Sequence, residues 1–314
     1  MKSEVLVIVG PTASGKTKLS VELAKRCGGE VVSFDSMQVY RRMDIGTAKP
    51  SAEERADIPH HMLDVAEPDE DFSVARYVDL AAPVTEDILR RGKLPILVGG
   101  TGLYVDSLLS GRTFSPFQRS RGLREALERR LAELGGEALL EELRQADPDT
   151  ARRLHPNDHR RIVRALEVYQ STGKPLSQHD RETRDLPPRY RALTIGLNFT
   201  RREALWQRID ARVDEMMSVG LVEEVEALLR EGISQSCTSM QAIGYKEMAA
   251  ALWEGRDVVL AAEEIKLRTR QYAKRQLTWF RRNEAAKWIV WEHVPDFVSA
   301  LRTSTKYMEE SGLL

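Results

Sequence analysis

A short loop near the N-terminus has residue types suited to holding phosphate groups. The pattern G-x-x-x-x-G-K-[ST] is matched by Gly10, Pro11, Thr12, Ala13, Ser14, Gly15, Lys16 and Thr17. Glycines let backbone N–H groups converge on phosphate oxygens, and the N-terminus of a following helix adds positive potential. Lys16 supplies a cation, and the Thr17 hydroxyl can ligate Mg²⁺. The loop predicts that a diphosphate or a triphosphate binds here, without indicating which.

Two polar residues are expected at the same sheet edge as this loop. Asp35 follows the apolar run 31–34, and Thr101 lies in a second glycine loop, 99–102, that follows the apolar run 94–98. Parallel sheets place their ligand sites beyond the carboxyl ends of the strands. A carboxylate there can ligate Mg²⁺ or act as a general base, and capping a helix is a third possibility for Asp35. Thr101 can bond a substrate or cap the next helix.

These residues require strands and helices that alternate along the chain. Helical patterns occupy 18–26 and 73–91, and strand patterns occupy 4–10, 31–34, 94–98, 192–197 and 288–291. Such alternation is typical of a parallel sheet. We therefore predict an α/β fold, a P-loop NTPase-like parallel sheet flanked by helices.

One long segment interrupts this alternation. Residues 113–191 are helical in pattern, rich in arginine and broken by prolines. We predict a helical insertion domain there, between a first part of the core at 1–112 and a second part at 192–314. Long helices are expected at 202–231 and 263–282, and the second of these is basic.

Composition narrows the class of protein. The 314 residues are 42% hydrophobic and 30% charged, with a net charge of −1. No apolar run reaches the roughly 18 residues that a membrane helix needs, and the N-terminus shows no signal peptide. Cys27 and Cys237 lie far apart, which argues against a disulfide framework or a structural zinc site. We expect a cytoplasmic, monomeric protein without a membrane segment.

Several blocks of sequence, in one order, carry a family resemblance. They are G-P-T-A-S-G-K-T, D-S-M-Q-V-Y with M-D-I-G-T-A-K-P, G-G-T-G-L-Y, H-P-N-D-x-x-R-x-x-R-A-L-E-V-Y and G-Y-K-E. Together they resemble the bacterial tRNA dimethylallyltransferases, or tRNA isopentenyltransferases, from about Val5 to Arg282. Arg42 departs from the glycine that is usual in that family, outside the Asp35 block.

The resemblance implies a reaction. A dimethylallyl group would move from dimethylallyl diphosphate to N6 of the adenine at position 37, next to the anticodon of tRNA, releasing diphosphate. Asp35 matches the general base of the family, and Thr101 matches a residue that helps orient the adenine. Lys16, Arg212 and Mg²⁺ held by Thr17 would stabilise the departing diphosphate. Without the resemblance, Arg212 would be interpreted as part of a solvated helix face.

The expected partner is the anticodon arm of tRNA. Two helices carry cations on one face, and from Lys266 to Lys287 eight Lys or Arg residues face one acid. Each cluster alone is more often a solvated face, but the resemblance favours phosphate contacts. The predicted tRNA-binding residues are Asp35, Ser36, Met37, Gln38, Arg124, Arg160, Arg161, Arg164, Gln241, Gly244, Tyr245, Lys246, Lys266, Arg270 and Lys274. His60 also matches a family position, and we assign it no role.

Three alternatives stay open. A P-loop kinase for a small metabolite would bind ATP and could use Lys16 and Asp35 equally well. An adenylate isopentenyltransferase would prenylate free AMP, with less need of a helical insertion and a basic helix. An RNA-binding protein without chemistry would leave Asp35 and Thr101 unexplained.

Overall fold

The chain forms two compact units. The computed structural model describes residues 4–111, 121–184 and 186–314. Met1–Leu109 and Arg189–Leu314 make up the larger one, here called the core unit, and Ser110–Pro188 make up the helical unit. The insertion predicted at 113–191 overlaps the helical unit.

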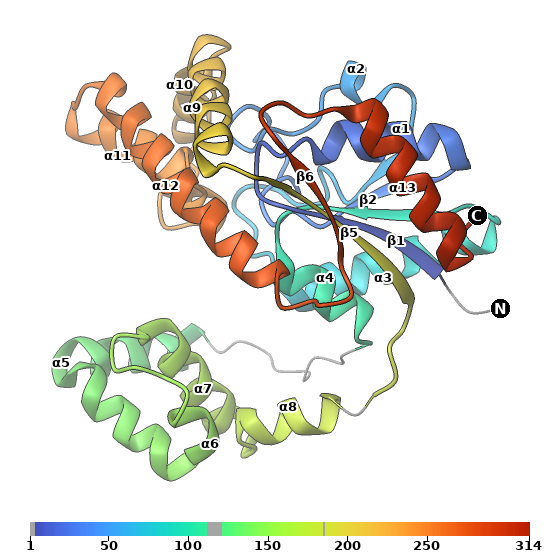
Figure 1. Cartoon of the computed structure of the whole chain (residues 1–314). Coiled ribbons are helices and arrows are strands. Elements are labelled where there is room, and N and C mark those ends of the chain that lie inside the picture. Colours follow the sequence, from blue (N-terminus) through green and yellow to red (C-terminus); the bar gives the residue numbers. More distant parts are fainter. Residues whose placement is uncertain (1–3, 112–120, 185) are drawn as a thin grey trace. The chain divides into compact units, whose positions relative to one another are not determined.

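A six-stranded parallel sheet forms the centre of the core unit (Figure 1). The strand order is β3-β2-β4-β1-β5-β6. The strands are β1 (Glu4–Val9), β2 (Glu30–Ser33), β3 (His60–His61), β4 (Pro95–Val98), β5 (Arg191–Phe199) and β6 (Lys287–Trp291). The predicted α/β fold and five predicted strands are confirmed. Strand β3 was not predicted, because two adjacent histidines provide no apolar pattern to recognise.

Helices cover both faces of this sheet. Figure 1 shows α1 and α13 on one face and α3 and α4 on the other. Apolar strand residues such as Leu6, Ile8 and Leu97 are fully buried beneath them. The helices of the core unit are α1 (Lys16–Cys27), α2 (Ala52–Arg55), α3 (Val74–Arg90), α4 (Gly102–Leu109), α9 (Arg202–Ser218), α10 (Leu221–Arg230), α11 (Tyr245–Glu254), α12 (Val258–Phe280) and α13 (Phe297–Ser311), with a 3₁₀ turn at Ser239–Gln241.

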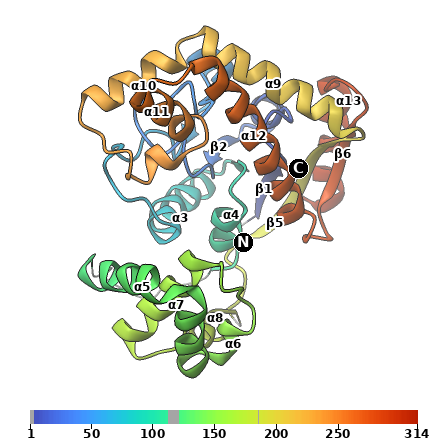
Figure 2. The same ribbon diagram turned by 90° about the vertical axis from the view of Figure 1, so that its left-hand side faces the viewer.

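Helices α9 to α12 gather beside one end of the sheet (Figures 1 and 2). The prediction of one helix at 202–231 is wrong. The chain breaks between α9 and α10 because Gly220 adopts a left-handed conformation with φ of 110°, which few other residue types tolerate. Helix α12 also begins earlier than predicted, where the Asp257 side chain accepts a hydrogen bond from the Val259 N–H at 2.8 Å.

The helical unit has a small core of its own. Leu139, Leu143, Ile162 and Leu166 are fully buried in it. Its helices are α5 (Arg121–Ala146), α6 (Pro148–Ala151), α7 (His159–Thr172) and α8 (Leu176–Arg184). The Asp158 side chain does not cap α7: its carboxylate accepts a hydrogen bond from the His155 N–H at 2.9 Å.

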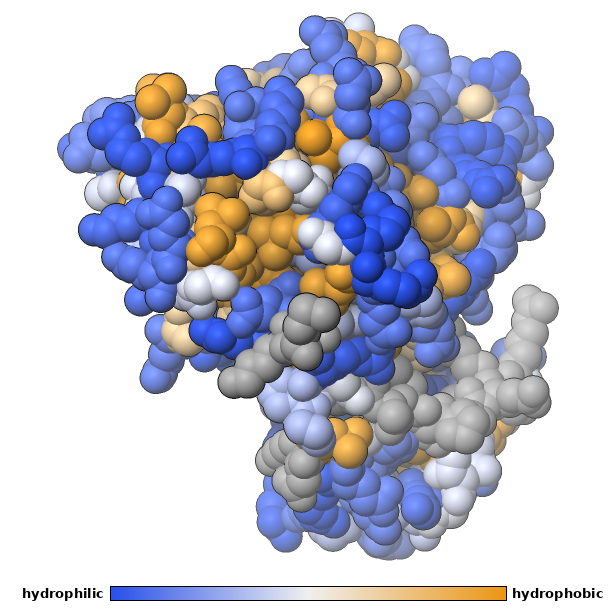
Figure 3. All heavy atoms as spheres, turned by 90° about the vertical axis from the view of Figure 1, so that its right-hand side faces the viewer, coloured by the Kyte–Doolittle hydropathy of each residue, from blue (hydrophilic) through white to orange (hydrophobic). Residues whose placement is uncertain are grey.

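One face of the protein is mainly hydrophilic (Figure 3). Figure 3 shows mostly blue residues on the face seen from the right-hand side of Figure 1, with orange hydrophobic residues gathered in several places. Within the described part of the chain, no helix has both the length and the apolar character needed to cross a membrane.

Gly99 lets the ends of β2 and β4 approach closely. The Phe34 N–H donates to the Val98 carbonyl at 2.8 Å, and the Thr101 N–H donates to the Phe34 carbonyl at 3.3 Å. A Cβ atom at position 99 would lie only 2.7 Å from the carbonyl carbon of Phe34 and 2.8 Å from its oxygen. This close approach brings the residues after β2 and β4, including Asp35 and Thr101, to one edge of the sheet.

We expect Gly99→Ala to destabilise the protein, because its methyl group meets backbone that cannot move without separating two strands. Overpacking of this kind costs about 1–3 kcal/mol, which corresponds to a fall of several degrees in Tm. Differential scanning calorimetry measures the change. Gly122→Ala is the control, since its added Cβ meets no atom within 4 Å. An unchanged Tm for Gly99→Ala would show that this contact does not hold the strand ends together.

Candidate active site

A cavity of about 960 Å³ opens beyond the carboxyl ends of the strands in the core unit. The phosphate loop forms one part of its lining, and the residues after β2 and β4 form another. Residues from α9 and α12 complete it, together with a loop at 44–50. The sheet, the phosphate loop and the gathered helices therefore meet at one site.

The phosphate loop wraps around its own lysine. Lys16 Nζ donates hydrogen bonds to the carbonyl oxygens of Gly10 at 3.0 Å and Pro11 at 2.8 Å. The Ser14 hydroxyl is buried and has no hydrogen-bond partner among the described residues. Thr17 lines the cavity. A buried hydroxyl without a partner is uncommon, and an anion in the loop would provide its acceptor.

Burial and neighbouring charges shift the pKa of Lys16. Desolvation and, to a smaller extent, the positive charge of Arg212 lower the pKa of Lys16, the charge of Asp35 opposes both, and the resulting pKa is about 7. A bound anion would reverse this effect, because negative charge favours the ammonium form.

Two arginines of α9 reach the same loop. Arg208 Nε donates to the Ala13 carbonyl oxygen at 2.9 Å, and Arg212 Nη1 donates to the Thr12 hydroxyl at 3.4 Å. Burial lowers the pKa of both side chains. Arg212 was predicted for this site only through the family resemblance, and its position shows that it is not part of a solvated helix face. Arg208 was not predicted. Arg208 lies four residues before Arg212, so both side chains are on one helix face, and this spacing could have identified Arg208 from the sequence.

Asp35 lies in a turn, so the helix-cap alternative is wrong. Its Oδ1 accepts hydrogen bonds from the N–H groups of Met37 at 2.9 Å and Gln38 at 3.4 Å. These bonds fix one carboxylate oxygen. A Cβ atom at Gly100 would lie 3.9 Å from the other oxygen, Oδ2. The Asp35 carboxylate therefore has a set orientation in the cavity.

Thr101 joins the second glycine loop to the Asp35 turn. Its Oγ1 accepts from the Ser36 N–H at 3.0 Å and donates to the Ser36 hydroxyl at 3.2 Å. Tyr272 of α12 also lines the cavity. Its pKa is raised to about 12, first by burial and then by the negative charge of Asp35. Tyr272 was not among the predicted site residues.

Gln276 is a second residue that sequence reasoning missed. Its Oε1 accepts from the Thr12 N–H at 3.0 Å, and its Nε2 donates to the Gly100 carbonyl at 3.0 Å. This buried amide connects the two glycine loops across the cavity. No local pattern identifies it, because its partners lie far away in the sequence.

Two of the three cations on the basic face predicted for α12 are paired with acids. Lys266 Nζ lies 2.6 Å from Asp214 and 2.7 Å from Glu263, and Arg270 Nη1 lies 2.6 Å from Asp210. Acids on α9 thus neutralise two of the three predicted cations, and only Lys274 is exposed. The geometry opposes a direct phosphate contact by Lys266 or Arg270.

The other predicted tRNA contacts divide into buried and accessible residues. Tyr245 is fully buried, which is a correction to its predicted role as a contact. The exposed ones are Lys246, Arg160 and Arg161. Gln241 lines the cavity, as do Ser36, Met37 and Gln38.

In the helical unit, Arg164 pairs with the buried Glu167 at 3.0 Å and Arg124 with Glu128 at 2.9 Å. Gly244 is the N-cap of α11 and has a φ of 101°.

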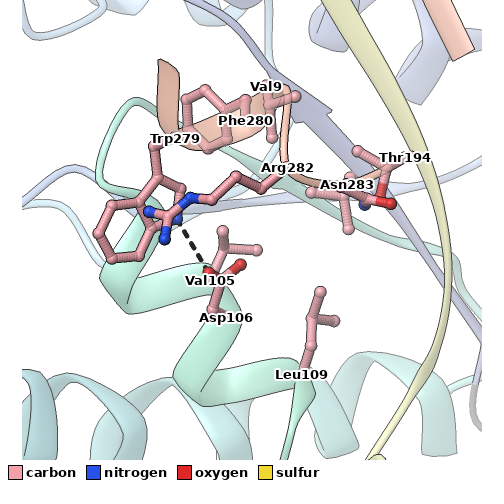
Figure 4. Close-up of a pocket in the computed structure, with 10 residues that line it drawn as sticks. Val9, Val105, Asp106, Leu109, Thr194, Trp279, Phe280, Arg282 and Asn283 are labelled. Carbon is pink, nitrogen blue, oxygen red and sulfur yellow. Dashed lines mark hydrogen bonds between the residues drawn. The ribbon is translucent and has the colours of Figure 1, made fainter. Parts of the chain in front are cut away.

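A smaller cavity of about 260 Å³ lies near Val105 and Leu109 of α4 and the end of α12 (Figure 4). Trp279 Nε1 donates to Asp106 Oδ2 at 2.9 Å, and the Arg282 guanidinium lies 4.1 Å from the centroid of the Trp279 ring. This cavity contains neither the phosphate loop nor Asp35, so the larger cavity is the candidate active site.

Comparison with known families assigns the chain to a family. The model of the family described as IPP transferase matches residues 38–283. The chain belongs to this family. An isopentenyl transferase family model also matches residues 3–65.

Relatives cover almost the whole chain. A tRNA dimethylallyltransferase of Thermoanaerobacter sp. (strain X514) is 47% identical over 98% of both chains. Another, from Caldanaerobacter subterraneus subsp. tengcongensis, is 50% identical over 92% of both.

Solved structures of similar proteins agree with this family assignment. The tRNA isopentenylpyrophosphate transferase of Bacillus halodurans superimposes with a TM-score of 0.72 at 42% identity, covering 99% of this chain and 98% of its own. A eukaryotic dimethylallyltransferase described as acting on tRNA gives a TM-score of 0.82 at 32% identity, covering 98% of this chain and 80% of its own.

The protonation of Lys16 should control the affinity of the site for inorganic diphosphate. Because the pKa of Lys16 is about 7, the free site must take up a proton above that pH to present an ammonium group to the anion. We expect the Kd to rise by up to about tenfold per pH unit above pH 7, beyond any change caused by the ionisation of diphosphate itself. Isothermal titration calorimetry over a pH series measures the Kd.

Lys16→Met is the matched control, since it keeps the chain length but has no titrating group. Its pH dependence reports diphosphate ionisation alone. If the parent and Lys16→Met have the same slope, Lys16 does not titrate in this range.

Proposed function

We propose that this protein is a tRNA dimethylallyltransferase that moves the dimethylallyl group of dimethylallyl diphosphate to N6 of adenine at tRNA position 37, releasing diphosphate. One observation carries the proposal: a single cavity holds both a cationic phosphate loop and the oriented carboxylate of Asp35. Family membership supports the same function, because the relatives are named as tRNA dimethylallyltransferases.

The acceptor needs a base. The lone pair of the adenine N6 is delocalised into the ring, so the amine is a poor nucleophile. As N6 attacks the allylic carbon, Asp35 accepts its proton. The Met37 and Gln38 amides hold Oδ1, which leaves Oδ2 for this transfer. Thr101 keeps the Asp35 turn against the second glycine loop.

The leaving group needs positive charge. When the allylic C–O bond breaks, negative charge grows on the diphosphate oxygens. Lys16, Arg208 and Arg212 lie around the loop that would hold them, together with the backbone amides of the loop. Groups fixed in place before the reaction stabilise this charge without reorganisation. In this role, a loop of the type used for nucleotides holds the diphosphate of a prenyl donor.

The residues present fit a magnesium ion. Among the described residues, no group of three or more His, Cys, Asp or Glu side chains could hold a metal by itself. Mg²⁺ typically keeps several waters and binds through few protein ligands plus substrate phosphates, so Thr17 with a bound diphosphate is a suitable set. The ion would supply further charge for the departing diphosphate.

The tRNA would be bound in part by the helical unit. Arg160 and Arg161 are exposed at the start of α7 and are suited to phosphate contacts. The target base must leave the stack of the anticodon loop to reach the Asp35 carboxylate. A cytoplasmic location and a monomeric state stay predictions.

The protein should add one isopentenyl mass to adenosine when incubated with unmodified tRNA, Mg²⁺ and dimethylallyl diphosphate. Mass spectrometry of the digested nucleosides detects the product. Asp35→Ala should lower kcat by ~10²–10⁴, the usual contribution of a general base, with little change in affinity for tRNA.

Two controls separate the alternatives. ATP in place of the prenyl donor should give no product, and free AMP should be a poor acceptor. Phosphate transfer from ATP to a small acceptor without prenyl transfer would establish the kinase alternative. Near-normal turnover by Asp35→Ala would remove Asp35 as the base.

Removal of Arg160 and Arg161 should weaken tRNA binding and make it less dependent on salt. Each phosphate contact contributes about 0.7 to 0.9 to the slope of log affinity against log salt, so the double alanine variant should flatten the slope by roughly one to two units. A salt titration by fluorescence anisotropy measures it.

Lys266→Ala with Arg270→Ala is the comparison. Because Asp214, Glu263 and Asp210 already neutralise these cations, we expect the slope of this variant to match the parent. A flattened slope here and an unaltered one for the Arg160 and Arg161 variant would place the tRNA surface on α12 instead.

A further inference from the structure

A single carboxylate holds the loop that forms one wall of the candidate active site. Glu224 of α10 accepts hydrogen bonds from three consecutive backbone N–H groups: Asp44 at 2.8 Å, Ile45 at 2.9 Å and Gly46 at 3.1 Å. Hydrogen bonds to an ionised acceptor are stronger than those between neutral groups. The three amides therefore fix the beginning of the 44–50 loop to a helix distant in sequence.

The other side of this loop is connected to Asp35. The Gln38 side-chain amide donates to the carbonyl oxygens of Thr47 at 3.2 Å and Ala48 at 3.1 Å. The backbone N–H of the same glutamine donates to Asp35 Oδ1 at 3.4 Å. A continuous path of hydrogen bonds and short backbone segments thus runs from Glu224, through the loop and Gln38, to the carboxylate of Asp35.

Tyr245 completes the arrangement. Its hydroxyl donates to Glu224, and its side chain is fully buried. Burial, followed by the charge of Glu224, raises the pKa of Tyr245, so the hydroxyl stays a donor. A Cβ atom at Gly46 would lie 2.4 Å from the Tyr245 ring, and only glycine permits this contact.

Lys49, a residue of the 44–50 loop itself, also holds the loop in place. The Lys49 side chain is only 6% exposed, and its Nζ donates to the Tyr40 carbonyl at 2.8 Å and to Asp64 at 2.6 Å. Lys49 secures the end of the loop, and Glu224 secures the beginning. Between these two anchors, Ile45, Gly46, Thr47 and Ala48 line the cavity.

We propose that Glu224, supported by Tyr245, is a positioning residue for the prenyl transfer: it holds the 44–50 wall in place and, through Gln38, orients the Asp35 carboxylate. This inference rests on the proposed function. It also gives the buried tyrosine of the G-Y-K-E block a role different from tRNA contact. A displacement of about 1 Å in a reacting group can cost ~10²-fold in rate, so the anchor acts on kcat although it does not touch the substrate.

Glu224→Gln tests the proposal. The variant keeps the side-chain shape but replaces one acceptor oxygen with an amide donor that faces backbone donors. We expect kcat at saturating tRNA and dimethylallyl diphosphate to fall by about 10- to 100-fold. The Kd for inorganic diphosphate should change less than about twofold, because the path does not include the phosphate loop.

A second readout follows the loop itself. Hydrogen-exchange mass spectrometry should show faster exchange in the peptide containing residues 44–50 and unchanged exchange in the phosphate-loop peptide. Glu226→Gln is the matched control, because this acid lies on an exposed side of the same helix. It should match the parent in both measurements. Tyr245→Phe keeps the carboxylate and should lose less activity than Glu224→Gln.

The outcomes are distinct. Normal kcat with normal exchange in Glu224→Gln overturns the inference, as does a loss confined to Tm. A parent protein that does not prenylate tRNA removes the proposed function, whatever the exchange result. If Glu224→Gln yields no folded protein, Tyr245→Phe decides: lower kcat with faster exchange at 44–50 supports the inference, and no change in either overturns it.

Discussion

The buried positive charge at the phosphate loop is the constraint on which the rest of the site depends. Lys16 and Arg212 both line the cavity, where burial lowers the pKa of each and the charge of Arg212 acts on Lys16. Burying cations is costly unless an anion or hydrogen-bond acceptors compensate. Backbone carbonyls of the loop provide part of this compensation for Lys16. The arrangement is therefore suited to a negatively charged ligand, and the strands, α9 and α12 hold it in place.

The first part of the chain supplies the phosphate loop and the carboxylate, and the last part supplies two arginines and the residues that hold the site together. The phosphate loop, Asp35 and Thr101 follow strands of the first part. Gln276 of α12 connects the two glycine loops, Arg208 of α9 binds the phosphate loop, and Glu224 of α10 anchors the wall next to Asp35. A site built from both parts cannot form until the chain on either side of the helical unit has come together.

The positive charges on α12 and on the helical unit differ in whether acids pair with them. A count of Lys and Arg along α12 indicated a binding face, but Asp210 and Asp214 of α9 neutralise two of these cations. Such pairs join the helices that line the cavity. In the helical unit, Arg160 and Arg161 are exposed. Their charge is therefore accessible to phosphates of a polyanion, whose bound counterions it would displace.

The sequence by itself determined the sheet, the phosphate loop and the positions of Asp35 and Thr101. Each follows from a local pattern: an apolar run, a glycine spacing, or a polar residue at the end of a strand. Only the tertiary structure decided that Gln276 bridges two loops, that Lys266 is neutralised, that Tyr245 is buried against Glu224 and that two histidines form an edge strand. The partners of these residues are brought close by folding across long stretches of chain, and a periodic pattern reports only which neighbours share a face within a few residues.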